Sequence, residues 1–251
     1  MQVGENMQYT ISGREKPRDE NIISYLSRAY SQIPFEEIES VFAFTEPCTL
    51  YGGRQFIRPE LSSLDIHLMY DHGIGFRIPL TNNYAEIDGY KQYRGFLEKY
   101  HRPGNSVIIV NDDLARWIRE DFPGYKVEAS IIKNIKSYDR IDTALKIYDT
   151  VVLPTSLNEN LDFLSKINAK ERITLFAYAG CGVNCPAKIC YPSISKFNKF
   201  QGRVEVECSQ TLKAREYRGK VDFDLGKYVE MGFNRFKLIE PSASVTNQRL
   251  A

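Results

Sequence analysis

Short apolar runs alternate with amphipathic stretches along most of the chain. Residues 107–110 form the clearest strand pattern, because four β-branched apolar residues follow one another there. Further strands are predicted at 40–46, 73–80, 125–132, 149–154, 172–180 and 234–240. Helices are predicted at 19–31, 61–73, 89–104, 114–122, 142–148, 156–168 and 224–233. Continuous apolar strands that alternate with helices are typical of a parallel sheet covered on both faces, so residues 107–110 should be buried on both sides.

Seven strands in this alternation favour closure into a TIM-type (β/α) barrel in a single domain, and the pattern also allows an incomplete or distorted barrel. The alternative is an open, doubly wound sheet. No GxGxxG motif opens the first strand–helix unit, which removes the usual reason to prefer that fold. Residues 1–39 contain one predicted helix, capped by Asn21, and are interpreted as an N-terminal helical extension. Residues 40–251 are assigned to the barrel, with a cysteine cluster at 181–208.

Composition narrows the functional classes. Hydrophobic residues make up 43% of the 251, enough for a large core, and the formal net charge of +1 gives no strong signal for nucleic acid. No run of eighteen apolar residues predicts a membrane span, and the polar N-terminus does not resemble a signal peptide. We therefore expect a cytoplasmic protein. A protein partner or an oligomer is left open.

Cysteine placement is the most specific chemical signal. Cys181, Cys185, Cys190 and Cys208 fall within a short stretch, whereas Cys48 lies far upstream. Clustered thiols in a cytoplasmic chain favour a metal site over disulfides, and thiolates suit iron–sulfur clusters or zinc. The chain has Cys-x3-Cys-x4-Cys and no CxxC pair, which favours the wider iron–sulfur cluster over zinc. The alternative is that these cysteines are small buried apolar residues.

Polar residues that follow the predicted strands are candidates for a substrate site, because the carboxyl ends of barrel strands meet at one mouth. These candidates are Glu46, Asn82, Asn111, Ser130, Lys237 and Glu240. Helix capping is the alternative for such residues, and it is the preferred interpretation for Asp112, Asp113 and Ser156. Lys237 lies in an apolar run and needs a partner, so it is expected either to pair with Glu46 or Glu240 at the barrel seam or to hold a substrate.

Several segments resemble one known family. Residues 173–191 (ITLFAYAGCGVNCPAKICY) resemble the strand-plus-cysteine segment of the collagenase-like peptidase family (peptidase U-32 type). That family includes iron–sulfur proteins required for oxygen-independent hydroxylation of ubiquinone and RNA. Residues 73–83, 106–132 and 148–154 resemble its barrel strands in the same order, and Cys208 with residues 224–240 resembles its closing element.

The resemblance implies a TIM-like barrel that carries a 4Fe–4S cluster and takes part in a hydroxylation or another redox modification. The implied ligands are Cys181, Cys185 and Cys208, with either Cys190 or Cys48 as the fourth. Zinc is the alternative metal.

Two other functions stay open: a peptidase-like hydrolase, and a non-catalytic binding barrel with a structural metal or none. For a hydrolase the chain offers no HExxH or GxSxG motif, and its three histidines fall in helix-like segments. Whether the protein is an enzyme, and whether its substrate is a small molecule or a macromolecule, also stays open.

Overall fold

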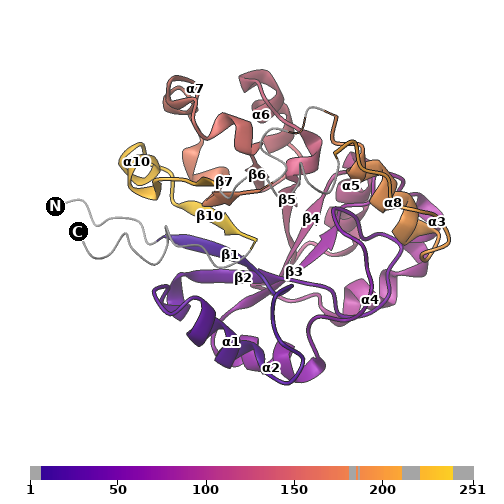
Figure 1. Cartoon of the computed structure of the whole chain (residues 1–251). Coiled ribbons are helices and arrows are strands. Elements are labelled where there is room, and N and C mark those ends of the chain that lie inside the picture. Colours follow the sequence, from indigo (N-terminus) through magenta and orange to yellow (C-terminus); the bar gives the residue numbers. More distant parts are fainter. Residues whose placement is uncertain (1–6, 181–184, 186, 211–220, 240–251) are drawn as a thin grey trace.

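Eight parallel strands form a closed barrel in a computed structural model that describes residues 7–180, 185, 187–210 and 221–239 (Figure 1). The strands are β1 Gln8–Ser12, β2 Ile38–Phe42, β3 Gly75–Leu80, β4 Ser106–Ile109, β5 Lys126–Ala129, β6 Thr150–Val152, β7 Ile173–Phe176 and β10 Arg235–Leu238. Their order around the ring is β1-β10-β7-β6-β5-β4-β3-β2. The predicted TIM-type architecture is confirmed.

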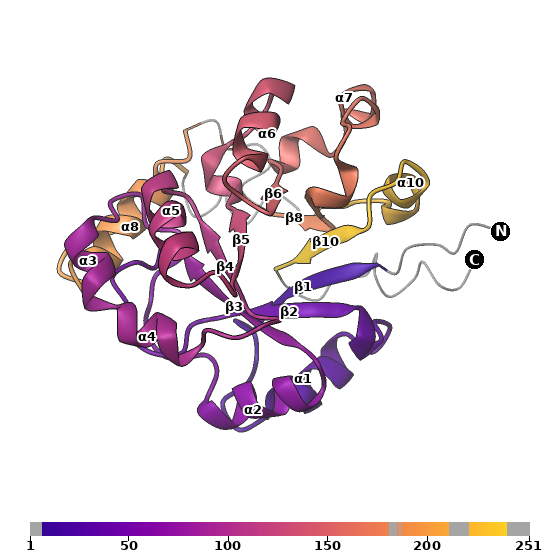
Figure 2. The same ribbon diagram turned by 180° about the vertical axis from the view of Figure 1, so that it is seen from behind.

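Helices pack around the outside of this ring (Figure 2). They are α1 Ile22–Ala29, α2 Ser63–Asp71, α3 Ile87–Gln92, α4 Arg94–Lys99, α5 Asp112–Asp121, α6 Tyr138–Leu145, α7 Leu161–Ser165, α8 Cys190–Lys199 and α10 Leu225–Glu230. β8 Tyr178–Ala179 and β9 Val221–Asp222 pair separately as a small antiparallel sheet. Among the helices of the described residues, none combines the length and apolar character that crossing a membrane requires.

Strand β1 corrects the interpretation of residues 1–39 as a helical extension. It pairs with β10 on one side and β2 on the other, so it is an integral barrel strand and α1 is the first crossover helix. Helix α1 itself is confirmed, including its cap, because the Asn21 side chain accepts a hydrogen bond from the Ser24 amide at 2.9 Å. The β1 pattern was missed because its inward side chains, Gln8, Thr10 and Ser12, are polar.

The inside of the barrel is divided into two layers. A polar layer occupies the first three positions of the strands, and its members are Glu39, Ser40, Arg77, Ser106, Glu128, Thr150, Thr174, Arg235 and Lys237. Thr10 joins this layer through its hydroxyl, which lies 3.5 Å from Ser40 Oγ. Nearer the carboxyl ends, Ile108, Val152 and Phe176 form an apolar cluster. TIM barrels are usually filled by branched apolar side chains, so the polar layer is the unusual part of this interior.

The outward faces of the strands build the main core against the helices. β4 shows this arrangement: Val107 and Ile109 face the helices with no exposed surface, whereas Ile108 faces the barrel interior. The expectation that this segment is buried on both faces is therefore confirmed for residues 107–109. Val110, just after the strand, is half-buried.

Truncating Ile109 tests this packing. Ile109→Ala should lower the free energy of unfolding by about 2–5 kcal/mol, because it leaves a cavity where the side chain is fully enclosed. Denaturant titration of both proteins measures the difference. Ile57→Ala is the control, since that side chain is 71% exposed and should change stability little. A comparable small effect for both variants would contradict the described core.

Candidate functional site

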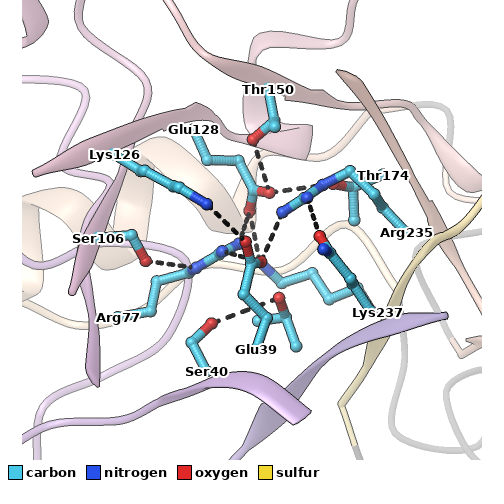
Figure 3. Close-up of polar contacts among 12 residues, drawn as sticks. Glu39, Ser40, Arg77, Ser106, Lys126, Glu128, Thr150, Thr174, Arg235 and Lys237 are labelled. Carbon is cyan, nitrogen blue, oxygen red and sulfur yellow. Dashed lines mark hydrogen bonds and ion pairs between the residues drawn. The ribbon is translucent and has the colours of Figure 1, made fainter. Parts of the chain in front are cut away.

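Arg77 is the centre of the polar layer inside the barrel (Figure 3). Its guanidinium contacts carboxylates from two other strands: Nη2 lies 2.8 Å from Glu39 Oε2, and Nη1 lies 2.7 Å from Glu128 Oε1. Its Nε donates a hydrogen bond to Ser106 Oγ at 2.8 Å. The planar guanidinium suits this role because it presents donors in several fixed directions. Arg77 therefore links β2, β3, β4 and β5 through the barrel interior.

Two cations from β10 complete the charged cluster. Arg235 Nη2 lies 2.5 Å from Glu39 Oε2, and Lys237 Nζ lies 3.3 Å from Glu128 Oε1. The Lys237 ammonium also lies 4.6 Å from the centre of the Phe42 ring.

Two threonine hydroxyl groups form hydrogen bonds to the second carboxylate oxygen of Glu128. Thr150 and Thr174 donate hydrogen bonds to its Oε2 at 3.2 and 3.0 Å. Each carboxylate in the layer therefore has several charged or polar partners, as a buried charge requires.

Positive charge exceeds negative charge in this buried cluster, since Arg77, Arg235 and Lys237 face Glu39 and Glu128. Burial of Lys237, opposed by Glu128 and reinforced by Arg77, lowers the pKa of its ammonium to about 8. The neighbouring arginines, working against burial, lower the pKa of both Glu39 and Glu128 to about 2. An arginine keeps its proton, so Lys237 is the cation that can relieve the excess charge.

The structure pairs Lys237 with Glu128, whereas the predicted partners were Glu46 and Glu240. Glu46 lies elsewhere, with its Oε1 2.8 Å from Lys99 Nζ, and Glu240 lies outside the described residues. Only 4% of Lys237 is exposed. The structure therefore shows an ion pair across the barrel interior, not a seam between the first and last strands.

The other predicted substrate residues are engaged in local structure. Asn111 caps α5 by accepting hydrogen bonds from the Asp113 and Leu114 amides, at 2.9 and 3.0 Å. The cap is thus Asn111 and not the aspartates that follow it. Ser130 caps a short 3-10 helix at Ile131–Lys133, where its Oγ accepts from the Ile132 amide at 3.3 Å.

Asn82 is a buried anchor between loops. Its Nδ2 donates to the Thr49 and Tyr51 carbonyl oxygens at 2.7 and 3.2 Å, and to the Ser195 carbonyl at 2.9 Å. Its Oδ1 accepts from the Tyr84 amide. The side chain therefore joins the loops after β2 and β3 to α8, and its amide is fully used by protein partners.

The cysteine-bearing segment departs from the usual barrel connection. Between β7 and β10 the chain leaves the ring, and α8 lies beside α3 in both views, far from β7 (Figures 1 and 2). The helix forms hydrogen bonds to the long loop after β2, residues 43–61, and to residues 82–86, which follow β3. This segment therefore reaches across the carboxyl-end mouth of the barrel.

Asn198 and Ser195 fasten α8 to that mouth. Asn198 accepts from the Phe56 amide at 2.8 Å and donates to the Tyr51 and Arg54 carbonyls at 3.1 and 2.9 Å. Ser195 Oγ accepts from the backbone and side-chain amides of Asn83, both at 3.1 Å. Both α8 residues are buried, so the helix is held by hydrogen bonds shielded from water.

Three of the predicted metal ligands lie in the described part of this segment: Cys185, Cys190 and Cys208. Cys185 Sγ lies 3.7 Å from Ser209 Oγ and 4.0 Å from Gln210 Nε2, and the Gln210 amide donates to Cys208 Sγ at 3.4 Å. Cys190 is the first residue of α8. Burial and the charge of Lys136 lower the pKa of Lys188, and the nearby Cys185 and Cys190 oppose this shift only in part.

Whether these residues suit a metal site depends on the donor atoms that they offer. Cys185 and Cys190 are half-buried and Cys208 is exposed, and thiolates are the donors that iron–sulfur clusters use. The predicted ligand Cys181 lies outside the described residues. Within the described residues, no three cysteine, histidine or acidic side chains converge as a metal-binding group. The residue types fit a cluster, and the described part of the chain holds three of the four predicted thiols.

Cys48 lies apart from the other cysteines. It is buried, and burial raises the pKa of its thiol to about 12. It lines a hollow of about 320 Å³ together with Phe197 and Gln201 at the carboxyl-terminal end of α8, whereas Cys190 begins that helix. Seven residues of helix, roughly 10 Å, separate Cys190 from Phe197.

A second hollow of about 260 Å³ adjoins the first and shares Thr49 and Gln201 with it. Among the predicted substrate residues that the structure describes, none lines either hollow. The charged residues Arg77, Glu39, Glu128 and Arg235 were not among the site residues predicted from the sequence. A signal for three of them was present, since Arg77, Glu128 and Arg235 interrupt strands predicted to be buried on both faces, where a charge needs a partner.

These features define a TIM-type barrel with a charged interior layer and a cysteine-bearing excursion before its last strand. The chain has the fold of the solved U32 peptidase Mk0906: the TM-score is 0.62 and the sequence identity is 13%, over 96% of this chain and 97% of that one. No protein-family model and no curated protein matches the chain.

The charge excess in the barrel predicts a distinctive pH dependence. Lys237 has a folded pKa of about 8 against an ordinary 10.5, so its protonated form weakens the folded state below pH 8. This penalty is relieved as pH rises from 8 towards 10.5. The free energy of unfolding should therefore rise between pH 8 and 9.5 in the wild type and rise less in Lys237→Met.

Chemical denaturation at a series of pH values measures both profiles. Lys126→Met is the matched control, because Lys126 borders the same layer but its side chain is 62% exposed. This control should keep the wild-type slope. Parallel profiles for the wild type and Lys237→Met would contradict the assignment of the excess charge to Lys237.

Proposed function

We propose that this chain is an iron–sulfur-binding barrel protein that takes part in a hydroxylation or another redox modification. Cys181, Cys185, Cys190 and Cys208 would hold a 4Fe–4S cluster at the carboxyl-end mouth of the barrel. The observation that carries the proposal is that Cys185, Cys190 and Cys208 all lie on the one segment whose helix α8 is fastened to the loops at that mouth. When bound, the cluster would supply one-electron chemistry.

The surroundings of these thiols support ligand roles. A reactive or ligating cysteine needs access and an electropositive neighbourhood. Cys185, Cys190 and Cys208 are accessible, and Lys188 lies near two of them. The proposal includes a cytoplasmic location, where thiols stay reduced and free to bind iron.

Cys190 is the better fourth ligand than Cys48. Cys48 is enclosed at the far end of α8, and a thiol with a pKa of about 12 gives up its proton reluctantly. Cys190 shares the neighbourhood of Lys188 with Cys185. The placement of the two residues in the fold thus favours the set of four that lies within residues 181–208.

A peptidase is the second candidate, and the fold likeness to a U32 peptidase is the observation that favours it. The three histidines give this candidate no general base within the described site. His67 and His72 contact backbone carbonyls of their own helix, and His101 accepts from the Gly124 amide at 2.9 Å. If the site binds zinc, or if the barrel is a non-catalytic protein without a cluster, the purified protein in the experiment below should contain no iron.

Iron binding is tested by anaerobic purification with iron and sulfide analysis. The wild type should be brown, with broad absorption near ~400 nm from thiolate–iron charge transfer. Cys181→Ser, Cys185→Ser, Cys190→Ser and Cys208→Ser should each lose most of the iron, because a hydroxyl is a harder and less acidic donor.

Cys48→Ser is the matched control and should keep wild-type iron. Loss of iron in Cys48→Ser with retention in Cys190→Ser would reverse the choice of the fourth ligand. A wild type without iron or sulfide after anaerobic purification would refute the proposed function, and zinc in its place would identify the alternative metal.

A further inference from the structure

Helix α8 has a second set of contacts, separate from those that fasten it to the barrel. Ser193 Oγ accepts a hydrogen bond from the Glu207 amide at 2.7 Å and lies 3.5 Å from the Glu205 carbonyl oxygen, to which its hydroxyl donates. One serine therefore contacts two backbone groups of the stretch that leads into Cys208.

The position of Ser193 on the helix relates this contact to the cysteines. Residues three apart on an α-helix lie on the same face, so Ser193 and Cys190 share a face of α8. Glu207 immediately precedes Cys208. A short hydrogen bond from Ser193 to the Glu207 amide therefore brings the backbone of Cys208 to the helix face that carries Cys190.

The helix itself is fixed from another direction. Ser195 and Asn198 bind the loops after β2 and β3 and make no hydrogen bond to residues 205–207 among the described residues. Ser193 acts within the excursion, whereas Ser195 acts between the excursion and the barrel. The two serines therefore have separable roles on one helix.

We infer that Ser193 is a positioning residue that holds Cys208 beside Cys190. The inference rests on the proposed function for its purpose, because two thiols held together are useful as ligands of one cluster. Its physical content, the proximity of the two thiols, does not require a metal.

Thiol cross-linking in metal-free protein tests the inference directly. In a Cys181→Ser, Cys185→Ser background, a bifunctional thiol reagent such as dibromobimane should bridge Cys190 and Cys208 within one chain, as read by peptide mass spectrometry. Ser193→Ala should lower the yield several-fold, because Glu207 loses its acceptor. Ser193→Thr keeps a hydroxyl and should restore the yield.

Ser195→Ala is the matched control: it changes the same residue type on the same helix and should keep the wild-type cross-link while lowering the melting temperature. Equal yields in Ser193→Ala and Ser193→Thr would overturn the inference, even if both fold normally. In iron-loaded protein, Ser193→Ala should release iron to a chelator faster than Ser193→Thr. If the wild type holds no iron, the proposed function fails, and the cross-linking result still decides the role of Ser193.

Discussion

The pairing of Arg77 with Glu39 and Glu128 is the interaction on which the barrel depends. A charge inside a closed ring of strands has no water to solvate it, so each member of the layer must meet its partner at the correct height. Slipping β3 by one residue would turn Arg77 out of the ring and leave two carboxylates with fewer partners. The charged layer therefore specifies strand register more sharply than interchangeable apolar side chains would.

The amino ends and the carboxyl ends of the barrel strands therefore have different structural roles. The charged layer at the amino ends of the strands links β2, β3, β5 and β10 directly. At the carboxyl ends, α8 packs on the loops after β2 and β3, and the buried side chains of Asn82, Ser195 and Asn198 form hydrogen bonds between them. The ring of strands thus supports, at its carboxyl end, the segment that carries Cys185, Cys190 and Cys208.

Sequence pattern predicted seven of the eight barrel strands because their apolar runs are continuous. It missed β1, whose polar inward residues break that run, and it could not pair Arg77 with residues 38 and 51 positions away. Asn82 was found as a polar residue after a strand, but its partner Ser195 is 113 positions away. Local patterns therefore identify which residues are unusual, whereas their partners depend on ring closure. The cysteines were recognisable because their spacing is local.

The position of β10 between β1 and β7 has a consequence for biosynthesis. β1, the first of the eight barrel strands to be synthesised, acquires one of its two neighbours only after residue 238 has been made. Until then, Glu39 and Glu128 lack the cations of β10 and the ring has two open edges. During this time the seven strands already made have a charged interior that lacks its β10 partners. Their open edges are prone to wrong pairing. Closure of the ring by the β1–β10 pair removes both open edges at once.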